Sequence, residues 1–178
     1  MSSKNRTRIV IPCRLGYLNC WRAVAQYGGS AKYSVSAIIP KNDIETIEKI
    51  NKAIECVKEA SIQKWGGRIP ANLRNPLHDG DEEKPDNPIY QNCYYINAKS
   101  KEAPQVVDAH IEPITDQTEV YSGCYGKISI TLYAYNYNGN RGIAAALGNI
   151  QKLEDGEPLG GQIPAKDDFR EECEDFLN

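Results

Sequence analysis

Residues 125–137 alternate between two kinds of side chain with a period of two residues. The even positions are Gly126, Ile128, Ile130, Leu132 and Ala134, and the odd positions are Tyr125, Lys127, Ser129, Thr131, Tyr133, Tyr135 and Tyr137. Successive side chains of a β-strand point to opposite faces, so the pattern predicts a strand within 120–137 whose even positions face the core. Asn138-Gly139-Asn140 follows as a hairpin signal.

Most other regular segments also have strand character. Strands are expected at Thr7–Leu15, Lys32–Ile39, Cys93–Lys99 and Gly142–Leu153, with a weaker one at Gln105–Asp108. The AAAL core of Gly142–Leu153 could instead be helical, and residues 66–92, rich in proline and glycine, are expected to form a long surface loop. The whole pattern predicts a mainly β domain, a small antiparallel barrel or sandwich.

One helix is predicted between these strands. Asn42 is the expected N-cap, with Glu45 three residues later, and isoleucines recur at helical spacing from Ile44 onward. The helix should run to about Ala60, because Gly66-Gly67 must end it.

Basic and acidic side chains are separated along the chain. Residues 1–153 carry 19 basic and 15 acidic side chains, a net charge of +4, whereas residues 154–178 carry two and nine, a net charge of −7. A mildly basic body with an acidic end is typical of a polyanion binder that carries its own competitor. We therefore expect a binding domain over 1–153, and a linker with an acidic tail over 154–178.

Two surfaces combine cations with aromatic rings. The first is the odd face of 125–137, where tyrosines at i, i+2 and i+4 follow Lys127; the second is the N-terminal segment, where arginines of one strand parity precede Tyr17 and Trp21. Bases stack on rings while cations hold the phosphates, so both surfaces indicate single-strand binding. Alternatively, the rings pack in the interior and the cations form a solvated strand face. The expected contacts are Arg6, Arg8, Arg14, Tyr17, Trp21, Lys32, Lys127, Tyr133, Tyr135 and Tyr137.

Other chemistry has few candidates. Lys64, Trp65, Arg68 and Arg74 could form a stacking platform, although Trp65 closing over the helix is favoured. The acidic run from His78 to Glu83 admits a metal site, and a metal-dependent nuclease using 78–86 is the alternative function, but a solvated acidic loop is commoner. The six cysteines include no Cys-x-x-Cys pair, which disfavours zinc. We expect no enzyme activity, no metal and no cofactor.

Four segments carry a family resemblance: KYSVSAIIPK, KWGGRIPANLRNPLHDGDEEKPD, VYSGCYGKISITLYAYN and GNRGIAAALGNIQKLEDGEPLGG. They resemble tailed-phage single-stranded DNA-binding proteins, a family long catalogued as a domain of unknown function, over about residues 7–169. The resemblance implies an OB-fold and sequence-independent binding of single-stranded DNA in phage replication or recombination. The helix of an OB-fold usually lies between the third and fourth strands, whereas here it follows the second. Either a further strand lies before Pro40, with a bent first strand counted as one, or the barrel is elaborated.

The resemblance also implies that the acidic tail restrains DNA binding and contacts phage or host replication proteins. Phe169 and Phe176 are the only phenylalanines of the chain. The tail residues expected to act are Asp167, Asp168, Phe169, Glu171, Glu172, Glu174, Asp175 and Phe176. The short apolar run IVIP rules out a signal peptide or membrane span there, so we expect the cytoplasm of the infected bacterial host. A phage structural or interaction protein, or an RNA-binding barrel, remains an alternative.

Overall fold

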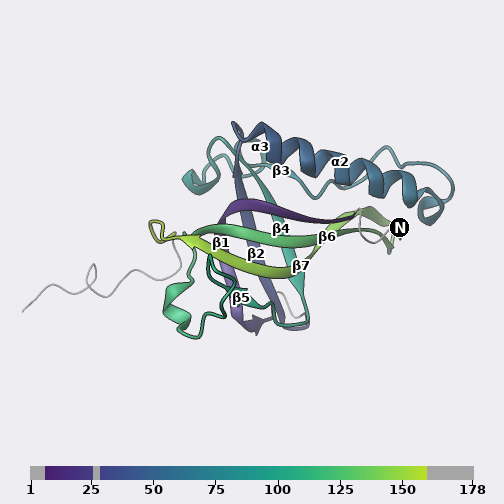
Figure 1. Ribbon diagram of the computed structural model, residues 1–178. Helices are drawn as coiled ribbons and strands as arrows, with labels where there is room; N and C mark the ends of the chain where they lie inside the picture. The colour runs from purple at the N-terminus through teal and green to yellow at the C-terminus, as the bar shows by residue number, and fades with distance from the viewer. Residues whose placement is uncertain (1–6, 26–28, 160–178) are drawn as a thin grey trace, which may run out of the picture.

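The computed structural model describes residues 7–25 and 29–159, in which five long strands close into a barrel and one long helix crosses its end (Figure 1). The barrel strands are β1 (Arg8–Val24), β2 (Lys32–Pro40), β4 (Cys93–Ser100), β6 (Tyr125–Tyr137) and β7 (Asn140–Glu154), and the helix is α2 (Ile44–Ala60). The shorter elements are η1 (Ile62–Trp65), β3 (His78–Asp79), α3 (Gly80–Glu83), η2 (Pro88–Tyr90), β5 (Val106–Val107) and η3 (Gln117–Glu119).

A parallel contact between β4 and β7 closes the barrel. The sheet runs β3-β4-β2-β1-β6-β7-β5, and Ala98 and Lys99 of β4 pair with Ala145 and Ala146 of β7. The other barrel pairs are antiparallel. This arrangement confirms the mainly β, OB-fold-like barrel.

The alternation of residues 125–137 places the core as predicted. Ile128, Ile130 and Leu132 are at most 1% exposed. The strand itself begins only at Tyr125. Ser129 departs from the pattern, since it is predicted to point outward but is buried. A register shift between Ile128 and Ile130 disturbs the ladder at this position, and the Ser129 hydroxyl accepts a hydrogen bond from the Asn149 amide at 2.7 Å.

The hairpin after β6 is confirmed. Asn138 and Gly139 both have positive φ angles, 50° and 81°, as a two-residue hairpin turn with right-handed strand twist requires. The return strand β7 starts at Asn140, so the helical alternative for the AAAL segment is wrong. Alternate residues Ile143, Ala145 and Leu147 point into the core, which is a strand pattern.

Strand β1 is longer than predicted and bends. Residues Arg8–Arg14 pair with β6, whereas Arg14–Val24 pair with β2. A register shift between Gly16 and Asn19 interrupts the second ladder, and Tyr17 within it has a φ of 44°. The predicted end at Leu15 is therefore wrong: the local alternation stops at this irregularity, but the strand continues.

Helix α2 lies between β2 and β4 in sequence, and residues 7–25 and 29–40 form two strands, the bent β1 and β2. The barrel is thus elaborated, with its long helix in the connection between its second and third strands. The helix ends at Ala60 as predicted, but its N-cap is Asp43 and not Asn42, because the Asp43 carboxylate accepts a hydrogen bond from the Thr46 amide at 3.3 Å.

Two predicted irregular regions contain more structure than expected. The 66–92 segment holds β3, α3 and η2, and Arg74 forms a parallel bridge with Gly142 of β7. The predicted strand at Gln105–Asp108 shortens to β5. Residues 155–159, expected to be a linker, contact the barrel: the Leu159 amide donates to the Ser122 carbonyl at 2.9 Å. Among the described residues, no helix is long and apolar enough to cross a membrane.

Candidate nucleic-acid interface

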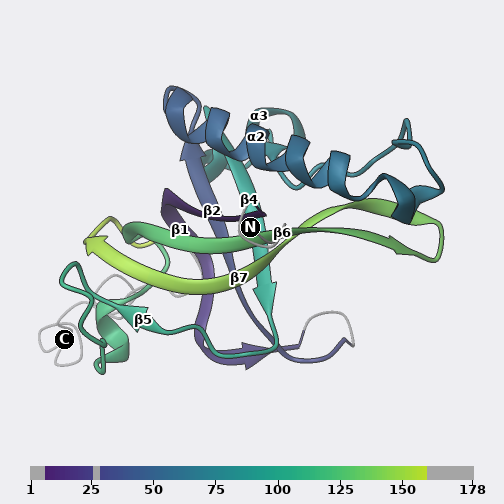
Figure 2. The same ribbon diagram turned by 45° about the vertical axis from the view of Figure 1, so that its right-hand side comes forward.

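The bend of β1 distributes the predicted contacts over two outer faces of the barrel. We call the outer face of Arg8–Arg14, β6 and β7 the β6 wall, and the outer face of Leu15–Val24, β2 and β4 the β2 wall. Figure 2 shows β6 and β7 crossing in front of the steep strands β2 and β4. A sequence pattern alone cannot show that one strand serves both walls.

The β6 wall carries most of the predicted contacts. Lys127 is exposed, and the rings of Tyr133 and Tyr137 are 48% and 72% exposed, so both rings are accessible for stacking. Tyr135 is half-buried instead, because its hydroxyl packs against Gly142. The contact is close: a Cβ added to Gly142 would lie 2.7 Å from the hydroxyl oxygen. The three tyrosines are therefore not equivalent.

The arginines of the N-terminal segment differ in the same way. Arg8 is exposed on the β6 wall, and its guanidinium lies 3.4 Å from the Ser129 hydroxyl. Arg14 is half-buried and donates to the carbonyls of Gly123 and Glu157 at 3.1 and 2.7 Å. The guanidinium of Arg14 therefore already binds the backbone at Gly123 and Glu157. Arg6 lies outside the described residues, as do all the predicted tail residues.

On the β2 wall, Tyr17 is 54% exposed and stacks on Tyr90, with ring centroids 6.1 Å apart. Its hydroxyl accepts a hydrogen bond from Asn87 at 3.0 Å, which holds the ring in place. Lys32 is half-buried at the start of β2. Trp21 packs against the core, and its indole N–H donates to the Val120 carbonyl at 3.2 Å, so its ring has a structural role.

Three polar residues beside Tyr17 were missed. Ser34, Asn97 and Lys99 line a cavity of about 160 Å³ together with Tyr17. The alternation of 93–99 contained the signal, because Asn97 and Lys99 occupy its outward positions. Without the partner strands, however, nothing indicated that they face Tyr17.

The strand register joins the two walls. Ser34 of β2 pairs with Lys99 of β4, Lys99 with Ala146 of β7, Ala146 with Thr131 of β6, and Thr131 with Arg8 of β1. Paired residues point to the same side of a sheet, so these five side chains form one continuous row around the barrel. We call it the cross-barrel row.

Arg8 and Lys99 of this row, and Lys127 beside it on β6, are available for phosphates. Within 7–25 and 29–159, neither Arg8, Lys99 nor Lys127 forms an ion pair. Lys41, in contrast, lies 2.8 Å from Asp79 and 2.7 Å from Asp81. Unpaired cations beside exposed rings match the requirements of single-strand binding.

The other predicted groups have structural surroundings. Trp65 is 3% exposed and its indole N–H donates to the Tyr135 carbonyl of β6, so its ring is buried and offers no stacking platform. His78 pairs with Glu83 and stacks on Tyr95. Burial raises the pKa of the Cys13 thiol to about 12, which keeps it protonated and unreactive. In the part of the chain that is described, no three His, Cys, Asp or Glu residues are grouped to hold a metal ion.

Comparison with known proteins agrees with this geometry. A family model described as "Enterobacter phage Enc34, ssDNA-binding protein" matches residues 7–177. A putative protein p50 of Acyrthosiphon pisum secondary endosymbiont phage 1 is 32% identical over 152 residues, covering 79% of each chain.

The chain belongs to the Enc34 family of phage single-stranded DNA-binding proteins.

Solved structures support the assignment. The Enc34 protein in complex with ssDNA is 27% identical, with a TM-score of 0.76, over 86% of this chain and 90% of that chain. A C-terminal truncation of the Enc34 protein gives a TM-score of 0.74 at 27% identity, over 86% of this chain and 89% of that chain. Gp2.5 of bacteriophage T7, at 18% identity, has a TM-score of 0.57 over 93% of this chain and 97% of that chain, and shares the fold.

Proposed function

We propose that this family member binds single-stranded DNA along the cross-barrel row, with Tyr17 stacking bases near Ser34 at one end and Tyr133 stacking bases beside Thr131. The register that places Lys99, Ala146, Thr131 and Arg8 side by side carries the proposal. It joins the predicted contacts on the two walls into one path. Lys32 and Lys127 flank the path, and Tyr135 and Tyr137 extend it onto the hairpin. Arg14, Trp21 and Arg6 remain predicted contacts, and Arg6 lies outside the described residues.

Small residues leave room for bases at the centre of this path. Ala144 and Ala146 occupy successive outward positions of β7, and Tyr133 pairs with Ala144. An exposed ring beside a methyl side chain offers an open face to a base. Lys99 and Arg8 stand on the two sides of Ala146 and can contact successive phosphates.

Substitution of Tyr133 and Lys99 tests the path. Tyr133→Ala should weaken binding of a mixed-sequence oligonucleotide by about 1–3 kcal/mol, the value of one stacked base, while Tyr133→Phe should retain most of the affinity because it keeps the ring. Lys99→Ala should weaken binding and make the log–log salt slope less negative by about 0.7.

The control is Lys52→Ala, which removes an exposed cation from α2. Fluorescence anisotropy at several salt concentrations measures all four variants. Equal affinity of the Tyr133→Ala and Tyr133→Phe variants would show that this ring does not stack. A mobility shift with DNA and RNA competitors decides the polymer preference.

For the acidic tail, we propose competition with DNA, supported by the net charge of −7 over 154–178 and the cations along the path. Truncation after Leu159 removes residues 160–178, with a net charge of −4, and should tighten DNA binding, most strongly at low salt. The shortened chain retains all the barrel strands and the contact between Leu159 and Ser122. Unchanged affinity would exclude competition, and loss of a pulled-down replication protein would support partner docking.

A role in phage replication or recombination, without enzyme activity, completes the proposal. It is supported by membership of a family described by DNA binding alone, and by the contacts between Lys41 and the acids Asp79 and Asp81 of the proposed nuclease loop. Incubation of labelled single-stranded DNA with magnesium or manganese tests it. Cleavage that is lost in an Asp79→Asn, Asp81→Asn double variant would favour the nuclease instead.

A further inference from the structure

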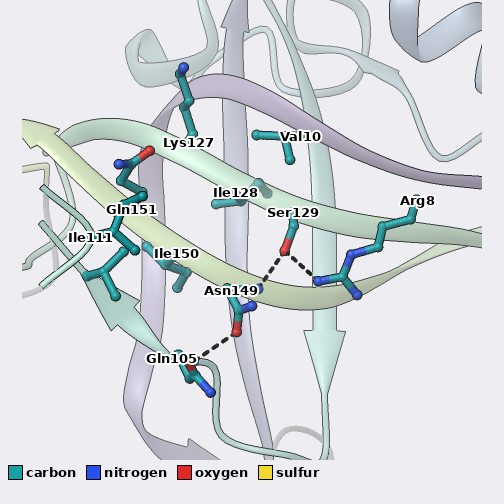
Figure 3. Close-up of a pocket in the computed structure, with 11 residues that line it drawn as sticks. Arg8, Val10, Gln105, Ile111, Lys127, Ile128, Ser129, Asn149, Ile150 and Gln151 are labelled. Carbon is teal, nitrogen blue, oxygen red and sulfur yellow. Dashed lines mark hydrogen bonds between the residues drawn. The ribbon is translucent and has the colours of Figure 1, made fainter. Parts of the chain in front are cut away.

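A groove on the β6 wall lies beyond the cross-barrel row. It has a volume of about 340 Å³ and runs between β1, β6, β7 and the segment that carries β5 (Figure 3). Arg8 lies on one side of the groove, Lys127 at its upper rim, and Ile111 on the opposite side from Arg8 (Figure 3). Arg8 belongs to both the row and the groove, so the two are continuous.

Ile111 is the most unusual residue of this groove. It is 73% exposed, and its φ of 64° lies in the left-handed region, which β-branched side chains strongly disfavour. A strained backbone that presents an apolar side chain to solvent persists only when its surroundings hold it, and such strain concentrates at ligand-binding sites.

Asp108 holds the turn that presents Ile111. Its carboxylate accepts hydrogen bonds from the amides of His110 at 2.8 Å and Glu112 at 3.0 Å, and its carbonyl accepts from the Ile111 amide at 3.0 Å. The Gln151 side chain of β7 donates to the Asp108 carbonyl at 3.2 Å, which ties the turn to the barrel. Ile111 is therefore held beside the groove by a polar network.

The rest of the lining mixes apolar side chains and two cations with four uncharged polar residues, Gln105, Ser129, Asn149 and Gln151 (Figure 3). Val10 is 46% exposed on the β1 side, and the half-buried Val107 lines the groove on the side of Ile111. The lining contains two cations, Arg8 and Lys127, and no acidic residue. Apolar surfaces that can contact the faces of a base, with cations on two sides for its phosphates, fit a nucleotide.

We propose that this groove is a second nucleotide subsite, in which one base of a single-stranded DNA lies between Ile111 and Val10 while Arg8 and Lys127 contact its flanking phosphates. The inference rests on the proposed function, because it extends the same strand along β6. Tyr133 and Lys127 are six residues apart, about 20 Å along a strand, so only a longer oligonucleotide reaches both.

An oligonucleotide length series on the full chain tests the subsite. Ile111→Gly removes the side chain and suits the positive φ, so folding should be retained, and thermal unfolding checks it. Ile111→Asn also tolerates this backbone and replaces the apolar surface with a polar one. Ile44→Ala is the matched control, because Ile44 is 64% exposed but lies on α2, outside the groove.

Across lengths of about 4 to 16 nucleotides, both Ile111 variants should bind the shortest oligonucleotides like the unmodified chain and the longest about fivefold more weakly. The Ile44→Ala variant should match the unmodified chain at every length. A length-independent loss, or no loss at all, overturns the subsite. The subsite is also overturned if the Ile111 variants bind DNA more tightly than the unmodified chain when the acidic tail is present, but not after truncation at Leu159. The groove would then hold the acidic segment and not a base. Binding of short oligonucleotides reports on the cross-barrel row, so these outcomes leave the proposed function intact.

Discussion

At the scale of single residues, the start of α2 depends on one carboxylate. The Asp43 side chain accepts a hydrogen bond from the Thr46 amide, one of the first amides of the helix, which have no partner within it. Asn42 is an equally good capping residue by type and precedes Asp43 directly. Residue type therefore cannot distinguish the two positions, since the choice depends on how β2 delivers the chain to the helix.

Asp43→Ala should lower the free energy of unfolding by about 0.5–2 kcal/mol, the usual cost of losing an N-cap. Asn42→Ala should change it by less than about 0.5 kcal/mol, as for most surface substitutions. Urea unfolding followed by circular dichroism measures both, and the order of the two effects is the decisive result. A larger loss from Asn42→Ala would place the cap one residue earlier.

At the scale of elements, Lys41 fastens the 78–83 segment to the end of β2. Its ammonium contacts Asp79 of β3 and Asp81 of α3, and hydrogen bonds from Lys41 lower the pKa of both carboxyls below their usual 3.8. A lowered pKa means that the folded chain holds protons less tightly than the unfolded chain. The stability from this contact is therefore present above about pH 4 and is lost as the pH falls through the lowered values.

The Asp79→Asn, Asp81→Asn double variant should be less stable than the unmodified chain at pH 7 and lose less further stability between about pH 5 and pH 2. Urea midpoints over this range measure the slope. The matched control is Asp86→Asn, on the same connection, for which no ion pair is found among the described residues. The Asp86→Asn variant should lose as much stability on acidification as the unmodified chain does. If the double variant also loses as much, the contact with Lys41 does not cause the pH dependence.

At the scale of the whole molecule, the proposed binding path depends on the closure of the barrel. Lys99 and Arg8 are 91 positions apart in the chain, and the pairings of β4, β7, β6 and β1 bring them onto one row. Cations gathered in this way release counterions together when a strand binds, which makes affinity depend steeply on salt.

Replacing Arg8, Lys99 and Lys127 by alanine together should make the log–log salt slope less negative by about 2, since each lost phosphate contact contributes about 0.7. Titrations between about 50 and 200 mM salt measure it. A triple variant at Lys52, Lys58 and Lys84, which lie outside the row and the groove, changes the net charge equally and should keep the slope. The same change in both variants would mean that net charge, and not the row, determines binding.

Periodicity in the sequence determined the strands, the helix and the hairpin, because alternation of side chains is a local property that survives whatever the element packs against. The alternation of 125–137 predicted the buried Ile128, Ile130 and Leu132 and the exposed Tyr133 and Tyr137 correctly. It failed at Ser129, where the register shift opposite Asn149 depends on the partner strand.

Only the tertiary structure decided how the proposed binding residues are grouped. The bend of β1 separates Tyr17 from Arg8, and the parallel contact of β4 with β7 joins Lys99 to Ala146. Neither leaves a local signal, because each depends on which distant segments bury their apolar faces together. The strain at Ile111 is equally invisible in the sequence, since a backbone held in a disfavoured conformation is set by the contacts of Asp108 and Gln151 and not by the residue itself.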